Sequence, residues 1–215
     1  MMRTLVRTRA LLLSLTLLGV FSAAPAAEAA TVTRTGSVVI FMADQGERNN
    51  LRVSQGVLLS QTVLTFTDTG AGITPASGFC DLINGVGMCA SNGVTHIWVN
   101  VRDKDDQVKV ATASSIGPVL TPTTLIGGRG IDVLIGGDGP DKIKGNNGRD
   151  FLRGRKGADI FKAGRGSDVV QALDGARDKR ITCGDGRRDL LRADRVDPRP
   201  KSCELGNKKR RSKRR

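Results

Sequence analysis

An aliphatic or phenyl residue recurs every nine positions between residues 127 and 171. These apolar residues are Leu134, Ile143, Leu152, Phe161 and Val170. Each occupies position 8 of a nine-residue unit. We predict a short strand at positions 7 to 9, whose position-8 side chain points inward because strand side chains alternate. No unit can bury one apolar residue alone, so the repeat predicts a stack in which two units make one coil.

Residues 31–118 also have the apolar pattern of β-structure. Stretches rich in Val, Ile, Leu and Thr, separated by Gly, Asn and Asp clusters, predict strands at residues 37–41, 56–67, 95–101 and 107–111. Ile97, Val99 and Val101 occupy alternate positions, so one face of that strand points inward. We infer that this segment continues the stack and caps its open end.

Glycine and aspartate stand in fixed register with the apolar residues. The position-4 glycines are Gly130, Gly139, Gly148, Gly157 and Gly166, and the position-6 aspartates are Asp132, Asp141, Asp150, Asp159 and Asp168. Glycine permits turns with φ > 0 and lets carbonyls approach a cation closely. Aspartate adds a carboxylate oxygen, and Ca²⁺ prefers carboxylate and carbonyl oxygens. Two units per coil would stack loops n and n+2 on the same side, with the metal between them.

These repeats resemble the RTX family (haemolysin-type calcium-binding repeats), which implies an all-β, parallel β-roll that binds Ca²⁺. In that family, one loop supplies carbonyls at positions 2 and 4 and its aspartate. The loop two units later supplies carbonyls at positions 1 and 3 and its own aspartate. The resemblance implies a first site of Gly128, Gly130, Asp132, Gly145, Asn147 and Asp150. It implies a second of Gly137, Gly139, Asp141, Gly154, Lys156 and Asp159, and a third of Asn146, Gly148, Asp150, Ala163, Arg165 and Asp168.

The chain departs from the family pattern at several loop positions. Basic residues stand at positions 2, 3 or 5 of the units, namely Arg129, Arg149, Arg155, Lys156 and Arg165. Where only carbonyls ligate, these side chains can point outward to water, although their charge opposes a bound cation. The alternative is a degenerate roll that keeps the fold and binds calcium feebly.

Both flanks of the repeats resemble eroded units. A fourth site, from Arg155, Gly157 and Asp159, needs a sixth unit, and we expect residues 172–179 to have lost the register. Residues 103–108 resemble a half-formed RTX turn in which lysine and arginine replace glycines, which puts metal binding there in doubt.

The N-terminus has the pattern of a secretory signal peptide. Arg3, Arg7 and Arg9 precede an apolar run at residues 10–21, and residues 24–26 and 27–29 both fit the A-x-A cleavage pattern. The alternative is an uncleaved N-terminal anchor. This arrangement resembles the RTX-type proteins that Gram-positive actinobacteria export by the general pathway. We therefore expect a secreted protein.

The chain contains four cysteines, which in an exported protein suggest two disulfides with three possible connectivities. The pairs close in sequence, Cys80–Cys89 and Cys183–Cys203, are favoured, and free or intermolecular thiols are the alternative. The absence of a C-x₂-C spacing and the single histidine, His96, argue against a zinc site.

Composition and charge divide the chain further. Aromatic residues make up only 3% of it, which suits a narrow roll better than a large core. The predicted parts are a signal peptide (1–30), a β-rich segment (31–118), the calcium-binding roll (119–180), a disulfide-linked C-terminal cap (181–204) and a basic tail (205–215). The net charge is +13, and the tail contributes Lys208, Lys209, Arg210, Arg211, Lys213, Arg214 and Arg215.

The basic tail has three interpretations. A block of like charges is usually a solvated, disordered tail. It can also retain an exported protein at the cell surface on anionic wall polymer or lipid. Extracellular DNA is the third partner considered, and the export signal argues against a specific nucleic-acid role.

We expect no enzymatic activity. The sequence has no H-E-x-x-H or G-x-S-x-G motif, and His96 on a strand is more readily a structural residue than a catalytic base. The sequence therefore predicts a calcium-binding protein. The rival role is surface attachment, in which the roll is a spacer and the tail does the binding.

Overall fold

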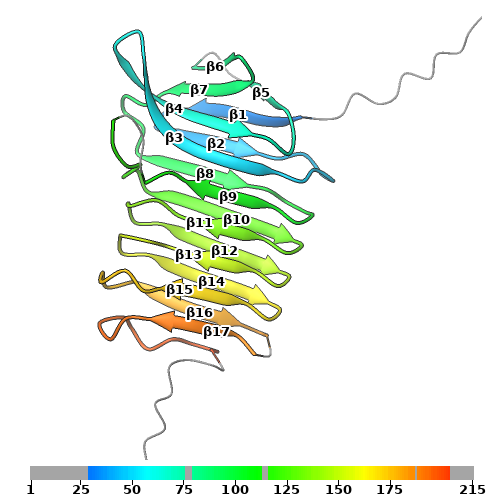
Figure 1. The fold of residues 1–215 in the computed structure, drawn as a ribbon, viewed down its shortest axis with the longest axis vertical. Helices are drawn as coiled ribbons and strands as arrows, with labels where there is room; N and C mark the ends of the chain where they lie inside the picture. The colour runs from blue at the N-terminus through cyan, green and yellow to red at the C-terminus, as the bar shows by residue number, and fades with distance from the viewer. Residues whose placement is uncertain (1–28, 76–78, 113–115, 187, 204–215) are drawn as a thin grey trace, which may run out of the picture.

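The computed structural model describes residues 29–75, 79–112, 116–186 and 188–203. The predicted signal peptide, apart from Ala29 and Ala30, and the basic tail lie outside the described residues. Within these ranges the strands form two sheets that run the length of one elongated stack (Figure 1). None of the described residues belongs to a helix long and apolar enough to cross a membrane.

The first sheet has the strand order β16-β14-β12-β10-β8-β2-β1-β5. Its strands are β1 (Ala30–Thr35), β2 (Val38–Met42), β5 (Ile73–Pro75), β8 (His96–Asn100), β10 (Thr123–Arg129), β12 (Lys142–Asn147), β14 (Ile160–Arg165) and β16 (Arg180–Gly184). From β2 to β16 all neighbours are parallel.

The second sheet has the order β17-β15-β13-β11-β9-β3-β4-β7-β6. Its strands are β3 (Asn50–Leu58), β4 (Gln61–Asp68), β6 (Cys80–Ile83), β7 (Val86–Ala90), β9 (Gln107–Val110), β11 (Val133–Ile135), β13 (Phe151–Arg153), β15 (Val169–Ala172) and β17 (Leu190–Ala193). Its neighbours from β3 through β9 to β17 are also parallel. The predicted all-β parallel roll is therefore confirmed.

The core is a pair of apolar ladders. In the first sheet, Val99, Leu125, Ile143, Phe161 and Ile181 follow one another in register, and each is at most 1% exposed. The second sheet supplies the facing ladder of Leu51, Val108, Leu134, Leu152, Val170 and Leu191. Every position-8 residue of the repeat lies in one of these ladders, because each coil contributes one inward side chain to each sheet.

The N-terminal segment joins the roll without a break in either sheet. Strand β8 pairs with β10 and β9 pairs with β11, so the parallel arrangement crosses residue 118. Beyond β2 and β3 the pairs β1·β2, β3·β4 and β4·β7 are antiparallel, and β5 pairs parallel with β1 at the edge of the first sheet. The rings of Phe41 and Phe66 stack there at 6.3 Å. The antiparallel strands end the solenoid by turning the chain back on itself.

The prediction of one strand across residues 56–67 is wrong. This region is a hairpin of β3 and β4, which turns at Leu59 (φ 48°) and Ser60 (φ 68°). Two left-handed residues make the tight turn that suits a hairpin. Leu-Ser carries none of the usual glycine or asparagine signal.

Both favoured disulfides are present. Cys80–Cys89 joins the directly paired residues of β6 and β7. Cys183–Cys203 ties the last described segment to β16, where Lys201 N–H donates to Ile181 O and Lys201 O accepts from Cys183 N–H. The second bridge therefore holds a short segment over the open edge of the first sheet.

Candidate metal centre

Loops at both edges of the roll carry the chain from one sheet to the other (Figure 1). The loops that contain Asp132, Asp150 and Asp168 run from the first sheet to the second, and we call them the first column. The loops that contain Asp141 and Asp159 run back, and we call them the second column. Two units per coil place loops 18 residues apart directly on one another.

The aspartates of each column form a hydrogen-bonded ladder. The backbone N–H of Asp132 donates to Oδ1 of Asp150 at 2.9 Å, and that of Asp150 donates to Oδ1 of Asp168 at 2.9 Å. In the second column, Asp141 N–H donates to Oδ1 of Asp159 at 2.8 Å. One carboxylate oxygen of each residue is thereby fixed, and the side chain has a set direction.

The second carboxylate oxygen is buried without a protein partner at most of these residues. The Oδ2 atoms of Asp132, Asp150, Asp159 and Asp168 have no hydrogen bond, although each residue is at most 1% exposed. Asp141 differs, since its Oδ2 accepts from Gly137 N–H at 2.7 Å. A buried, unpaired carboxylate oxygen is costly unless a cation or proton joins it.

The raised pKa values of these aspartates also favour a bound cation. Burial raises the pKa of Asp132 to about 7, and the neighbouring Asp150 carboxylate adds to the rise. The pKa of Asp159 rises to about 8, again through burial first and then through Asp141 and Asp178. With pKa values this high, Asp132 and Asp159 are partly protonated near neutral pH when no counter-ion is bound. A divalent cation would replace those protons and favour the ionised carboxylates.

The first glycine of four units leaves an open space beside this oxygen. A methyl group at Gly127, Gly136, Gly145 or Gly154 would overlap Oδ2 of the aspartate in the same unit. At Gly145 the methyl would also lie 2.6 Å from Ala163 O, and at Gly136 it would lie 2.8 Å from Gly154 O. We call this space the glycine cradle. At Gly127, Gly136 and Gly145, a carboxylate oxygen from one loop and a carbonyl oxygen from the loop two units later converge on it, whereas at Gly154 the second neighbour is Phe161 Cζ at 2.7 Å.

The glycine cradle does not arise from backbone strain, because the φ angles of these four glycines lie outside the left-handed region. The position-4 glycines serve another purpose. Gly130 (φ 129°) and Gly157 (φ 123°) adopt conformations closed to most side chains, and a methyl at Gly157 would overlap Gly139 O. Position 4 thus permits the turn and the stacking, and position 1 keeps the oxygen-lined space open.

The family model of the RTX calcium-binding nonapeptide repeat (four copies) matches residues 126–161, 135–170 and 154–176. Residues 126–176 are RTX calcium-binding repeats. No curated protein matches the chain, and no solved structure matches it. RTX repeats bind Ca²⁺, and the oxygen-lined glycine cradles fit that ion, which takes hard oxygen ligands at 2.3–2.6 Å.

The expected ligands all lie in the stacked RTX loops, in differing surroundings. The position-1 carbonyls of Gly145, Gly154 and Ala163 face the cradles of the loops 18 residues earlier. The position-3 carbonyls of Asn147 and Arg165 accept N–H groups of Gly130 and Gly148 at 3.0 and 2.9 Å, which leaves one lone pair on each oxygen.

The remaining expected carbonyls belong to residues packed against the preceding loop. A methyl at Gly128 would overlap Arg102 O, one at Gly139 would overlap Leu120 O, and one at Gly137 would lie 2.8 Å from Val119 O. Asn146 is left-handed, with φ 77°. This close stacking positions the loop backbone as a whole.

The basic residues of the RTX loops behave in two ways. Arg129, Arg149 and Arg165 are exposed, and Lys156 is also turned outward, with Nζ 3.7 Å from Asp138 Oδ2. Arg155 is the exception to the expected outward orientation. Its guanidinium donates to Val110 O at 2.6 Å and Gly136 O at 3.1 Å, so it satisfies carbonyls at the start of the second column.

The aspartate ladders extend beyond the five regular units. Asp106 N–H donates to Asp132 Oδ1 upstream, and Asp168 N–H donates to Asp189 Oδ1 downstream. In the second column, Asp159 N–H donates to Asp178 Oδ1 at 3.0 Å. The expectation that residues 172–179 leave the register is therefore wrong for Asp178.

One inserted residue conceals Asp178 in the sequence. In the regular unit one residue separates the aspartate from the apolar position, whereas Lys179 and Arg180 separate Asp178 from Ile181. Both of their N–H groups donate to Asp159 O, at 2.8 and 3.3 Å, which absorbs the extra residue. A search that allowed one insertion before the apolar residue would have found it.

Proposed function

We propose that this chain is an exported protein in which calcium, bound between stacked RTX loops, stabilises the β-roll. The observation that carries the proposal is the glycine cradle, where a buried aspartate oxygen and a carbonyl of the next loop in the same column face the same space. Without a cation, the carboxylates of one column must hold protons or repel one another. Calcium would neutralise them and tie consecutive coils together.

We assign three sites to the regular units, each between a loop and the loop two units later. The first joins Asp132 and Asp150, the second Asp141 and Asp159, and the third Asp150 and Asp168. The carbonyl ligands are those that the RTX resemblance implies at positions 1 to 4. The ladder supports this pairing, because it links the same aspartates in the same order.

Export is supported by the position of the first described strand and by the disulfides. Strand β1 begins at Ala30, directly after the second A-x-A motif at residues 27–29, and Ala30 is fully buried. Cleavage after Ala26 or Ala29 would leave β1 intact. Cys80–Cys89 and Cys183–Cys203 suit an oxidising compartment.

The proposal includes no catalytic activity. His96 Nε2 lies 2.9 Å from Thr124 Oγ1 on the outer face of the first sheet, and burial lowers its pKa. A histidine bonded to a threonine between adjacent strands suits a structural role better than that of a general base.

Calcium titration of the disulfide-bonded chain, followed by circular dichroism and thermal melting, tests the proposal. At ten times its dissociation constant, each site adds about 1.4 kcal/mol, so three sites add about 4 kcal/mol. The control replaces all five regular-unit aspartates with asparagine, which preserves shape and removes charge. We expect calcium to stabilise the wild type and leave the control unchanged. A wild type whose spectrum and melting temperature ignore chelator would contradict the proposal. Export is tested separately by sequencing the N-terminus of protein from the medium, where Ala27 or Ala30 should come first.

A further inference from the structure

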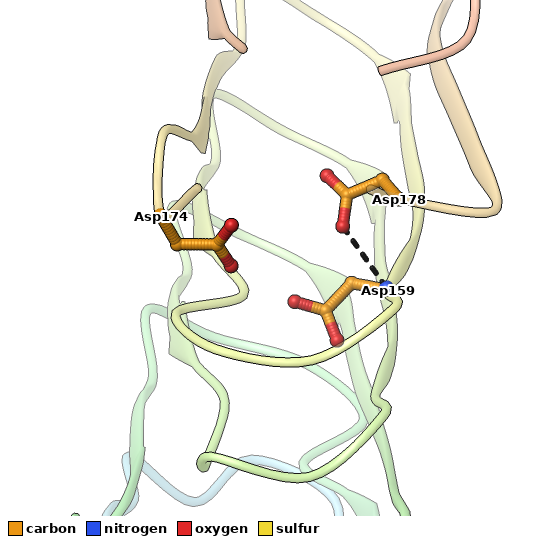
Figure 2. Close-up of side chains that lie close together, drawn as sticks. All are labelled: Asp159, Asp174 and Asp178. Carbon is orange, nitrogen blue, oxygen red and sulfur yellow. Dashed lines mark hydrogen bonds between the residues drawn. The ribbon is translucent and has the colours of Figure 1, made fainter. Parts of the chain in front are cut away.

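The second column, which holds the second site, ends in a group of three aspartates. Asp159, Asp174 and Asp178 each present a carboxylate oxygen, and these oxygens lie within 4.8 Å of one another (Figure 2). Asp159 is 0% exposed and Asp178 is 3% exposed. The Oδ2 atoms of all three are buried and have no hydrogen-bond partner. The cluster therefore contains buried oxygens that the protein leaves unsatisfied.

Each aspartate is held in place by its other contacts. Asp178 Oδ1 accepts Asp159 N–H, as in the regular ladder. Asp174 Oδ1 accepts Ala176 N–H at 2.7 Å, and Asp174 N–H donates to Asp194 Oδ2 at 2.8 Å. In Figure 2 the carboxylates of Asp159, Asp174 and Asp178 point toward a common space between two coils.

A glycine cradle serves this end of the column. A methyl at Gly154 would overlap Asp159 Oδ2, as at the three other cradles. The aspartate pairs at the ends of the first column lack this glycine. Ala163 stands in the register position of Gly145, before Asp168. Val101 stands in the register position of Gly127, before Asp106. Side chains stand at both of those positions, whereas Gly154 has none, and its second neighbour is the ring carbon Cζ of Phe161 at 2.7 Å.

We propose that Asp159, Asp174 and Asp178 form a fourth calcium site, an inference that rests on the proposed calcium binding of the roll. Arg155 (φ 71°) and Gly157 (φ 123°) have the left-handed turns of an RTX loop and supply its position-2 and position-4 carbonyls. Asp174 takes the place of a loop carbonyl. The site holds three carboxylates, one more than each regular site, and a higher ligand charge favours tighter calcium binding. This site fills first in a titration.

Calorimetric titration of the full chain with CaCl₂ tests the proposal in Asp174→Asn. Asparagine keeps an oxygen for Ala176 N–H and removes the charge that faces the space. Asp185→Asn is the matched control, since Asp185 is an exposed aspartate at the same end of the roll. We expect Asp174→Asn to bind one ion fewer per chain and to lose the tightest binding phase, with Asp185→Asn equal to wild type.

Hydrogen exchange gives a second readout, because calcium should protect residues 172–180 in wild type and not in Asp174→Asn. Equal stoichiometry and equal protection in Asp174→Asn and wild type would overturn the fourth site and leave the other three standing. A wild type that binds no calcium at all would instead overturn the proposed function, and the fourth site with it.

Discussion

Replacing Gly145 with alanine should remove one calcium ion. The φ of Gly145 lies outside the left-handed region, so alanine can adopt the same conformation. Its methyl group would overlap Asp150 Oδ2 and lie 2.6 Å from Ala163 O. Calcium keeps its ligand oxygens at about 2.3–2.6 Å. The methyl would therefore occupy the place of the ion in the third site.

The loss should be confined to that site. The carbonyl of residue 145, which serves the first site, remains in Gly145→Ala, and the native Ala163 shows that position 1 accepts alanine. At a calcium concentration ten times the dissociation constant, losing one site costs about 1.4 kcal/mol. For a chain of this length the rise in melting temperature on adding calcium should be about 3–6 °C smaller than in wild type.

Calorimetric stoichiometry and melting curves with and without calcium check this prediction. Gly56→Ala is the control, because a methyl there would first meet Thr65 Cγ2 at 3.8 Å, an ordinary contact. Without calcium, Gly145→Ala should also melt earlier than wild type, because the methyl overlaps Asp150 Oδ2 and displaces Ala163 O; the smaller rise in melting temperature on adding calcium therefore measures the lost site. If Gly145→Ala bound as many ions as wild type, the ion would not lie at the glycine cradle and the reasoning would fail.

Four further outcomes are expected. Asp150→Asn should lower the calcium stoichiometry by two and Asp132→Asn by one, because Asp150 belongs to two of the assigned sites; equal losses in calorimetry would refute the assignment. Calcium-free protein should be more stable at pH 5 than at pH 8 in denaturant titrations. Its Asp132 pKa of about 7 exceeds the unfolded value, so the stabilisation is complete below about pH 4 and disappears as the pH rises through 7. Leu152→Ala should destabilise the roll by about 2–5 kcal/mol in the same assay, since Leu152 is 0% exposed, and a loss below 1 kcal/mol would argue against a packed ladder. Reduction of Cys183–Cys203 in saturating calcium should expose residues after 174 to protease while residues 127–171 stay resistant, as peptide mapping would reveal.

The repeat made the roll predictable from sequence. The ladder residue Leu152 and the stacked Asp150 follow from a nine-residue period and the two-residue alternation of strands, which are local properties. Glycine at position 4 was also readable, because Gly157 needs a backbone conformation that few other residues adopt. Each of these features repeats, so five copies of a weak signal add up to a strong one.

What escaped prediction depends on contacts between distant segments. Asp178 keeps its place in the ladder although Lys179 interrupts the spacing, because hydrogen bonds to Asp159 in the preceding coil fix it. Arg102 and Lys104 adopt φ angles of 64° and 77° in a turn where glycine was expected. The following coil packs on these two residues and determines that conformation, which their own backbone preferences would not predict. Position-1 glycine was visible in the sequence, but its role as an open space appears only with the neighbouring loop in place.

The alternation of the two columns restricts how such a protein can change in length. Inserting 18 residues would add one coil, lengthen the molecule by about 4.8 Å, and add one loop to each edge with every later pairing intact. Inserting nine residues would transfer every later loop to the opposite edge. Asp159, Asp178 and the Cys183–Cys203 cap would move together and keep their mutual contacts. Contacts that span the insertion, such as those of Arg155 with Val110 O and Gly136 O, would be lost. Duplication or deletion of an even number of repeats therefore preserves every stacked contact, whereas an odd number breaks the contacts that span the change and leaves the C-terminal cap on its own edge strand.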